Sequence, residues 1–179
     1  MPDIWFIADT HFFHEGMLKF TDQNGQRIRH QFDNINQMNE AIISNWNSVV
    51  KPSDKIYHLG DVTFKYGKQL NELMSRLNGH KRLIVGNHDE GKEHTLTQWF
   101  EKISCWRLFK LEDMYLTATH VPIHSDSLMT KKLPGFNVHG HLHKKQVADK
   151  RYHCVSVENI NYTPIHMDEV QQIFRQRKY

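Results

Sequence analysis

Short apolar segments of this chain end repeatedly in small clusters of glycine, aspartate, asparagine and histidine, and this pattern restricts the folds that fit it. The clearest case is the run from Arg82 to Val85, which we interpret as a buried strand ending at Gly86-Asn87-His88-Asp89. Sheets of α/β proteins present ligand sites at the carboxyl ends of their strands. Four more clusters occupy comparable positions: Asp9-Thr10-His11, Gly60-Asp61, His120 and Gly140-His141-Leu142-His143. Together they predict one shared site at a sheet edge.

The composition is typical of a globular protein. With 179 residues, the chain is expected to form one domain over residues 1–179. Its net charge of +3 does not by itself indicate nucleic acid as a partner. No apolar run approaches the roughly 20 residues that span a bilayer, so we expect no membrane and a cytoplasmic location. Cys105 and Cys154 lack zinc-ribbon spacing and are expected to be buried free thiols.

The order of elements predicts an α/β fold in which one sheet packs on another and helices cover the outside. Helices are expected from a cap at Asn34 to residue 50, over 70–77, near 95–100 and from 168 onward. The segments 12–33 and 121–135 are interpreted as loops. Strands are expected over residues 4–8, 55–59, 82–85, 104–111, 114–119, 136–138 and 155–157.

The polar clusters supply a mixed set of nitrogen and oxygen ligands. Such a set suits Mn, Fe, Zn or Ni and lacks the thiolates of a structural zinc site. A carboxylate such as Asp61 can bridge two ions about 3.5–4 Å apart. His141 and His143 are two residues apart, so in an extended segment their rings point the same way. The candidate ligands exceed what one ion needs: Asp9, His11, Asp61, Asn87, His120, His141 and His143.

These motifs, in this order, resemble those of the calcineurin-like metallophosphoesterases. The resemblance covers most of the chain and is closest to the small, single-domain bacterial and phage-type branch. It implies a two-sheet β-sandwich flanked by α-helices, a four-layer αββα arrangement, with a dinuclear metal centre at the strand ends. It also implies a metal-dependent phosphoric ester hydrolase that acts on a small phosphate ester.

Carried over residue by residue, the resemblance assigns each ion its ligands. One ion would bind Asp9, His11, Asp61 and His143. The other would bind Asp61, Asn87, His120 and His141. The two ions, Mn first with Fe, Zn or Ni as alternatives, would activate a bridging hydroxide for attack on phosphorus. His88 would be the catalytic histidine that donates a hydrogen bond or a proton.

One position departs from the family pattern. Many members have a second aspartate three residues after Gly-Asp, where it orients the catalytic histidine, and this chain has Phe64 there. His88 is therefore expected to be held by Asp89 or by a backbone carbonyl, or else to be less strongly protonated.

Substrate contacts are less sharply indicated by the sequence. His14 and His124 are candidates for binding substrate phosphate, with exposed or supporting positions as the alternative. Arg27 and Arg29 could bind phosphate, although solvated charges are favoured.

We expect a phosphodiester of nucleotide or cyclic nucleotide type over a monoester, because no cap domain is evident. A catalytically weak metal-binding interaction scaffold of the same fold is the alternative function, and a homodimer is left open.

Overall fold

The computed structural model describes residues 2–177, apart from the side chain of Glu93. Met1, Lys178 and Tyr179 of the expected domain lie outside the described part.

The first of two sheets is largely parallel. This sheet has five strands in the order β4-β3-β2-β1-β9. Strands β1 to β4 are parallel and β9 is antiparallel to β1. Their bounds are Ile4–Ile7 for β1, Lys55–His58 for β2, His80–Ile84 for β3, Lys102–Ser104 for β4 and Ile165–His166 for β9.

The second sheet has four strands in the order β5-β6-β7-β8. Strands β5 and β6 are antiparallel, whereas β6, β7 and β8 run parallel. The register pairs Trp106, the first residue of β5, with Thr119, the last residue of β6. The strands are β5 (Trp106–Lys110), β6 (Tyr115–Thr119), β7 (Gly135–His139) and β8 (Tyr152–Cys154).

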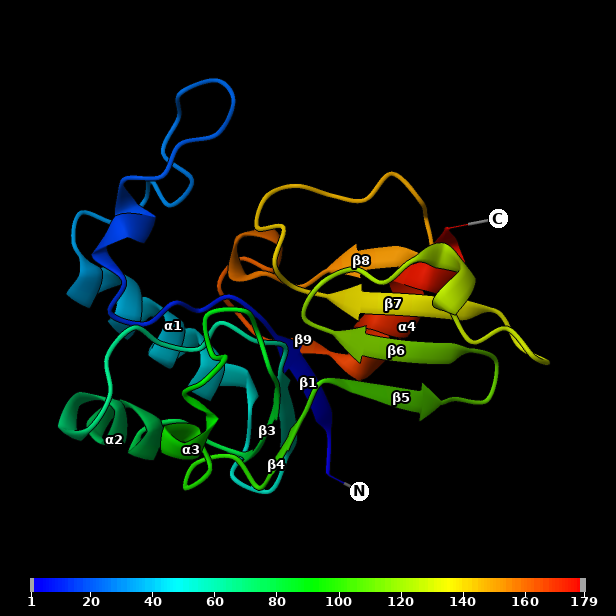
Figure 1. Cartoon of the computed structure of the whole chain (residues 1–179), viewed down its shortest axis with the longest axis horizontal. Helices are drawn as coiled ribbons and strands as arrows, with labels where there is room; N and C mark the ends of the chain where they lie inside the picture. The colour runs from blue at the N-terminus through cyan, green and yellow to red at the C-terminus, as the bar shows by residue number, and fades with distance from the viewer. Residues whose placement is uncertain (1, 178–179) are drawn as a thin grey trace.

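Helices flank the sheets, which confirms the predicted fold class. Figure 1 shows α1 (Ile35–Val49), α2 (Lys68–Ser75) and α3 (Glu93–Leu96) on one side of the first sheet, with the second sheet on the other side. The side chain of Asn34 caps α1 by accepting a hydrogen bond from the Gln37 amide, as expected. Helix α4 (Met167–Gln176) stacks Phe174 on Phe136 of β7. Three short 3₁₀ helices complete the described elements: Glu15–Leu18 (η1), Ser125–Ser127 (η2) and Val157–Asn159 (η3).

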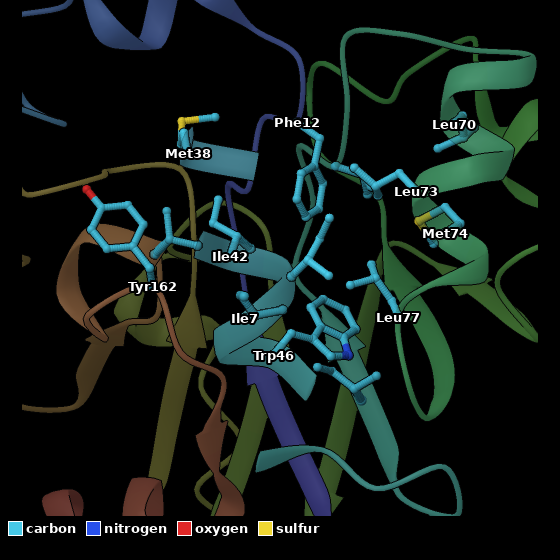
Figure 2. Packing of buried hydrophobic residues seen from close by; sticks show 14 of the residues in the cluster. Ile7, Phe12, Met38, Ile42, Trp46, Leu70, Leu73, Met74, Leu77 and Tyr162 are labelled. Carbon is cyan, nitrogen blue, oxygen red and sulfur yellow. The ribbon is translucent and has the colours of Figure 1, made fainter. Parts of the chain in front are cut away.

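Two hydrophobic cores lie on opposite faces of the first sheet. Side chains alternate along each strand, so Ile7 of β1 joins the core under the helices while Phe6 joins the core between the sheets. Figure 2 shows Ile7, Ile42 and Trp46 packed together in the helix-side core. Because both faces are covered, the strands are fixed in register and their carboxyl ends stay aligned.

The structure corrects two of the predicted strands. The expected strand 104–111 is divided at Cys105: β4 belongs to the first sheet and β5 to the second. The expected strand 155–157 is also wrong, because β8 ends at Cys154 and Val157 begins η3. In both places the chain crosses between sheets, and nothing in the local residue pattern marks such a crossing.

Candidate metal centre

The predicted ligand residues converge where the two sheets meet. Asp9, His11 and His143 form one group whose potential ligand atoms all lie within 4.8 Å of one another. Asp9, Asp61 and His120 form a second such group. These residues come from the carboxyl ends of β1, β2, β6 and β7, although Asp9 and His143 are far apart in the sequence. The alignment of strand ends therefore brings these predicted residues together.

Left-handed backbone conformations are concentrated at the candidate ligands. Positive φ angles occur at Asp9 (57°), His11 (47°), Asp61 (59°), His141 (69°) and His143 (51°). A non-glycine residue adopts such a conformation uncommonly, at a cost of about 1–3 kcal/mol. Strain gathered at one spot indicates that the backbone has been shaped to aim these side chains inward.

His141 and His143 reach the site by a different route from the one expected. They lie beyond the end of β7, in a turn where both have positive φ, rather than in an extended segment. The expectation of an extended pair is therefore wrong. Both side chains nevertheless face the cluster, because the left-handed turns redirect them.

Asp9 is completely buried and has one oxygen without a partner. Its Oδ2 accepts hydrogen bonds from the Ser156 hydroxyl at 2.7 Å and the His141 amide at 2.9 Å. Its Oδ1 has no hydrogen-bond partner. Burial raises the pKa of Asp9 to about 6. A buried carboxylate with a free oxygen is well suited to a cation.

His11 is the second unpaired group. Both of its ring nitrogens are buried without a hydrogen-bond partner, and Nε2 lies 3.7 Å from Asp61 Oδ2. Burial, reinforced by the positive charge of Arg29, lowers its pKa strongly. The ring is therefore neutral, which is the form that binds a metal ion.

Asp61 lies between the two groups. Its Oδ2 is 3.7 Å from His11 Nε2 and 3.5 Å from His120 Nε2. Its other oxygen accepts a hydrogen bond from the His88 amide at 2.9 Å. One carboxylate oxygen thus faces a ligand nitrogen from each predicted ion site.

Asn87 completes the more open side of the cluster. Its Oδ1 lies 2.9 Å from His120 Nε2 and 3.0 Å from His141 Nδ1. The Nδ1 of His120 donates to the Leu59 carbonyl oxygen at 2.7 Å, which leaves Nε2 as the nitrogen available to a metal ion. This donor set, with the unpaired atoms of Asp9 and His11, fits divalent cations.

Glu158 and Arg29 support the site; the sequence reasoning missed Glu158 and assigned Arg29 a different role. Glu158 Oε1 accepts from His143 Nδ1 at 3.0 Å and from Arg29 Nε at 2.8 Å. Burial alone would raise the pKa of Glu158, but the charge of Arg29 and the hydrogen bond from His143 lower it to about 2. Conversely, the Glu158 carboxylate outweighs the burial of His143 and raises the pKa of that ring.

Arg29 corrects the prediction of a solvated or phosphate-binding charge. Its side chain is fully buried. It also donates to the Asp9 carbonyl at 2.6 Å and the Thr10 carbonyl at 2.9 Å. Arg29 therefore supports the backbone that carries the first candidate ligands, and nothing in its local sequence indicates this.

His88 lies at the exposed rim of the cluster. Its ring centroid is 5.6 Å from that of His11 and 5.1 Å from that of Phe64. Asp89 does not hold the ring: its buried carboxylate accepts hydrogen bonds from the amides of Asp61, Val62 and Gly86. Of the alternatives for holding His88, Asp89 is therefore wrong, and Phe64 packs beside the ring.

The two candidate substrate histidines differ in placement. The His14 ring stacks on Phe64 with centroids 3.8 Å apart and lies near His11. His124 is 77% exposed and accepts a hydrogen bond from the Asp126 amide at the start of η2. The structure thus brings His14 close to the cluster and leaves His124 facing solvent.

Two pockets flank the cluster. One, of about 730 Å³, includes Asn87 and His120 in its lining. The other, of about 900 Å³, includes His141 and His143 together with Phe20, Lys144 and Lys145. Segments 121–129 and 17–28, which the sequence marked as loops, supply one wall of each pocket.

Comparison with known proteins identifies relatives along the whole chain. A family model described as calcineurin-like phosphoesterase matches residues 2–177. An uncharacterized protein of Methanocaldococcus jannaschii is 30% identical over 187 residues, covering 99% of this chain and 94% of the relative. The gene 66 protein of Mycobacterium phage L5 is 33% identical over 92 residues, covering 50% of this chain and 41% of the relative.

A solved structure has a similar fold. The crystal structure of a protein of unknown function from Aquifex aeolicus superposes with a TM-score of 0.75 at 27% identity. The match covers 97% of this chain and 100% of that chain. The similarity therefore extends over nearly all the described elements.

Proposed function

The chain belongs to the calcineurin-like phosphoesterase family, metal-dependent hydrolases of phosphoric esters, and we propose that it is a phosphodiesterase that uses two divalent cations. The observation that carries this proposal is the position of Asp61. Its Oδ2 lies within 4 Å of a nitrogen from His11 on one side and from His120 on the other. A carboxylate placed in this way can bridge two ions.

We assign the ligands to two sites. Asp9, His11, Asp61 and His143 would hold one ion. Asp61, Asn87, His120 and His141 would hold the other. Mn is the expected ion, with Fe, Zn and Ni as alternatives, because imidazole and carboxylate ligands accept all four.

The chemistry divides between the ions and the chain. Bound divalent cations supply Lewis-acid chemistry, which activates a water molecule for attack on phosphorus and neutralises charge on the phosphate oxygens. His88, at the rim, donates a hydrogen bond to the phosphate or a proton to the leaving oxygen. His14, whose ring stacks on Phe64, contributes a second imidazole on the same side of the cluster.

The preference for a diester is supported by the two flanking pockets. A phosphodiester carries two ester groups, and the cluster has a pocket on each side, of about 730 and 900 Å³. Both volumes lie in the usual range for small-molecule sites. A nucleotide or a cyclic nucleotide is the substrate class that we propose.

We also propose a cytoplasmic location and a single domain. Cys105 and Cys154 are both free thiols, which suits a reducing compartment, although Cys105 is exposed rather than buried as expected. In residues 2–177 there is no helix with the length and apolar character needed to cross a bilayer.

The experiment that tests the function uses bis-p-nitrophenyl phosphate and p-nitrophenyl phosphate as substrates with added Mn(II). We expect faster hydrolysis of the diester, complete loss with a chelator, and a fall of about 10²–10⁴-fold in kcat for His88→Ala. His94→Ala, on the exposed side of α3, is the matched control and should leave kcat unchanged.

Other outcomes would contradict parts of the proposal. Preferential hydrolysis of the monoester would refute the diesterase assignment. Two bound Mn ions without turnover of either substrate would favour the metal-binding scaffold. A chain that binds no divalent cation would refute the dinuclear centre itself.

A further inference from the structure

The smaller of the two pockets beside the metal centre is mostly apolar and lies on the face of the second sheet that points away from the core. Its volume is about 730 Å³. Strands β5 and β6 and the segments after β3 and β6 form it, and Figure 1 shows β5 and β6 side by side in the second sheet. The lining residues that matter below are Asn87, Glu90, Trp106, Leu108, Thr117 and His120.

The strand register places Trp106 next to the metal centre. Trp106 pairs with Thr119, and His120 follows Thr119 directly. Leu108 pairs with Thr117 on the same face, whereas Leu116 belongs to the core between the sheets. Pairing between β5 and β6 thus holds Trp106 beside the end of β6, next to the candidate ligand His120.

Exposed large hydrophobic side chains gather at the pockets. Among the described residues they are Trp106 (58% exposed), Phe20 (49%) and Val121 (47%). Trp106 and Val121 line the smaller pocket, and Phe20 lines the larger one. Large apolar groups left in water and grouped around a concavity mark a binding site.

The occupant of this pocket must reach the metal centre. Asn87 and His120 both line the pocket, and both contribute to the cluster through the contact between Asn87 Oδ1 and His120 Nε2. A group bound here can therefore be continuous with a phosphate held at the centre.

Charge argues against an anionic occupant. Glu90 contributes a carboxylate, and among the described residues no lysine or arginine lines this pocket. The larger pocket, in contrast, contains Lys144 and Lys145. A second phosphate would be repelled from the smaller pocket, whereas a neutral group with amino or imino hydrogens could donate to Glu90.

We propose that this pocket binds the base of a nucleoside esterified to the phosphate, by stacking on Trp106. The inference rests on the proposed phosphodiesterase function, because the phosphate must lie at the metal centre for the aromatic group to extend into the pocket. Stacking of a base on an aromatic side chain tolerates any base, since every base has a π-face. Trp106 is then a specificity-determining residue.

The test compares two diesters with the same leaving group, thymidine 5′-(p-nitrophenyl phosphate) and methyl p-nitrophenyl phosphate. We expect the wild type to prefer the thymidine ester, and Trp106→Ala to lower kcat/KM for that ester by about 10-fold. The methyl ester should be affected less than about twofold, because it has no second aromatic group to stack. Trp106→Phe should keep most of the preference.

Phe20→Ala is the matched control, since it removes an exposed aromatic ring from the other pocket. It should leave the preference between the two esters unchanged. Equal losses for both esters in Trp106→Ala, or no loss for either, would overturn the assignment of the pocket.

A binding measurement separates this inference from the proposed function. Thymidine, which has no phosphate, is titrated into the zinc-loaded protein while the indole N–H signals are followed by NMR. A shift of the Trp106 signal, identified by its loss in Trp106→Phe, would support the pocket even if neither ester were hydrolysed. An unshifted signal would refute it, as would self-association of the protein that buries Trp106 and excludes thymidine.

Discussion

The two halves of the candidate metal centre are built differently. The half formed by Asp9, His11 and His143 is the more buried: His11 is 2% exposed, and His143, although it lines the larger pocket, is hydrogen-bonded to the buried Glu158. In the half formed by Asn87, His120 and His141, Asn87 and His141 are exposed and a pocket adjoins it. Both halves adjoin a pocket, but the candidate ligands of the first half are buried or half-buried, whereas Asn87 and His141 of the second are exposed.

The two halves therefore suit different tasks, because one orients its candidate ligands firmly and the other exposes them to solvent. In the more buried half, a hydrogen-bonded chain from His143 through Glu158 to Arg29 fixes ligand orientation in a low dielectric. In the more exposed half, Asn87 Oδ1 lies against two imidazoles and beside free volume. We infer that the more buried half binds its ion more tightly and that the more exposed half exchanges ion and substrate.

The largest effect is expected where the halves join. Asp61→Asn keeps an oxygen but removes the charge that faces both His11 and His120. We expect kcat/KM to fall by about 10³-fold or more, because cation stabilisation of the transition state is worth several kcal/mol. Hydrolysis assays and metal analysis of the same preparation measure this.

Asp126→Asn makes the same chemical change at a side chain that is 90% exposed. It should leave kcat/KM and the metal content unchanged. If Asp61→Asn retained both ions and near-normal activity, the idea of a shared carboxylate would fail.

A smaller effect should distinguish the halves. Glu158→Gln removes the negative charge behind His143, and we expect a loss of about 10–100-fold in metal affinity at one site only. Asn87→Ala should weaken the other site. Calorimetric titration with Mn(II) resolves the two sites, and Glu101→Gln, at a half-exposed surface carboxylate, is the control.

Glu158→Gln is also expected to lower the thermal stability, because Arg29 remains buried without its counter-charge. Titrations should therefore be made well below the melting temperature. Equal weakening of both sites would show that the halves are not independent.

The smallest effect concerns the pH dependence of stability that comes from His58, a buried residue that contacts Thr10 beside the first candidate ligands. His58 is buried, its Nε2 lies 2.9 Å from Thr10 Oγ1, and burial lowers its pKa from 6.5 to about 3. The folded state therefore excludes a proton that the unfolded chain binds below pH 6.5. This contribution to stability is complete above pH 6.5 and is lost as the pH falls toward 3.

We expect the wild type to lose about 2 kcal/mol from this group between pH 6.5 and about pH 5, and His58→Gln to lose correspondingly less. Urea denaturation of the chelator-treated protein measures the difference without metal release. The control His94→Gln, at an exposed position, should follow the wild type. Identical pH profiles for wild type and His58→Gln would rule out the buried neutral imidazole.

The sequence itself contained the information for the first layer of the site. Asp9, His11, Asp61 and Asn87 each lie a few residues beyond the end of a strand of the first sheet, so the parallel order of the strands brings them together. These are local patterns repeated at strand ends. The family model over residues 2–177 confirms the fold and the class of enzyme that they indicated.

The supporting layer was decided by the tertiary structure. Arg29 and Glu158 lie 129 residues apart and form an ion pair because η3 follows the crossing from β8 to the end of β1. Trp106 borders the site only because the chain changes sheets at Cys105 and β5 then pairs with β6. For a charged or aromatic residue in an irregular or amphipathic segment, the local sequence pattern does not indicate which distant residue it will contact. Those partners are chosen by packing between distant segments, which the folded chain alone specifies.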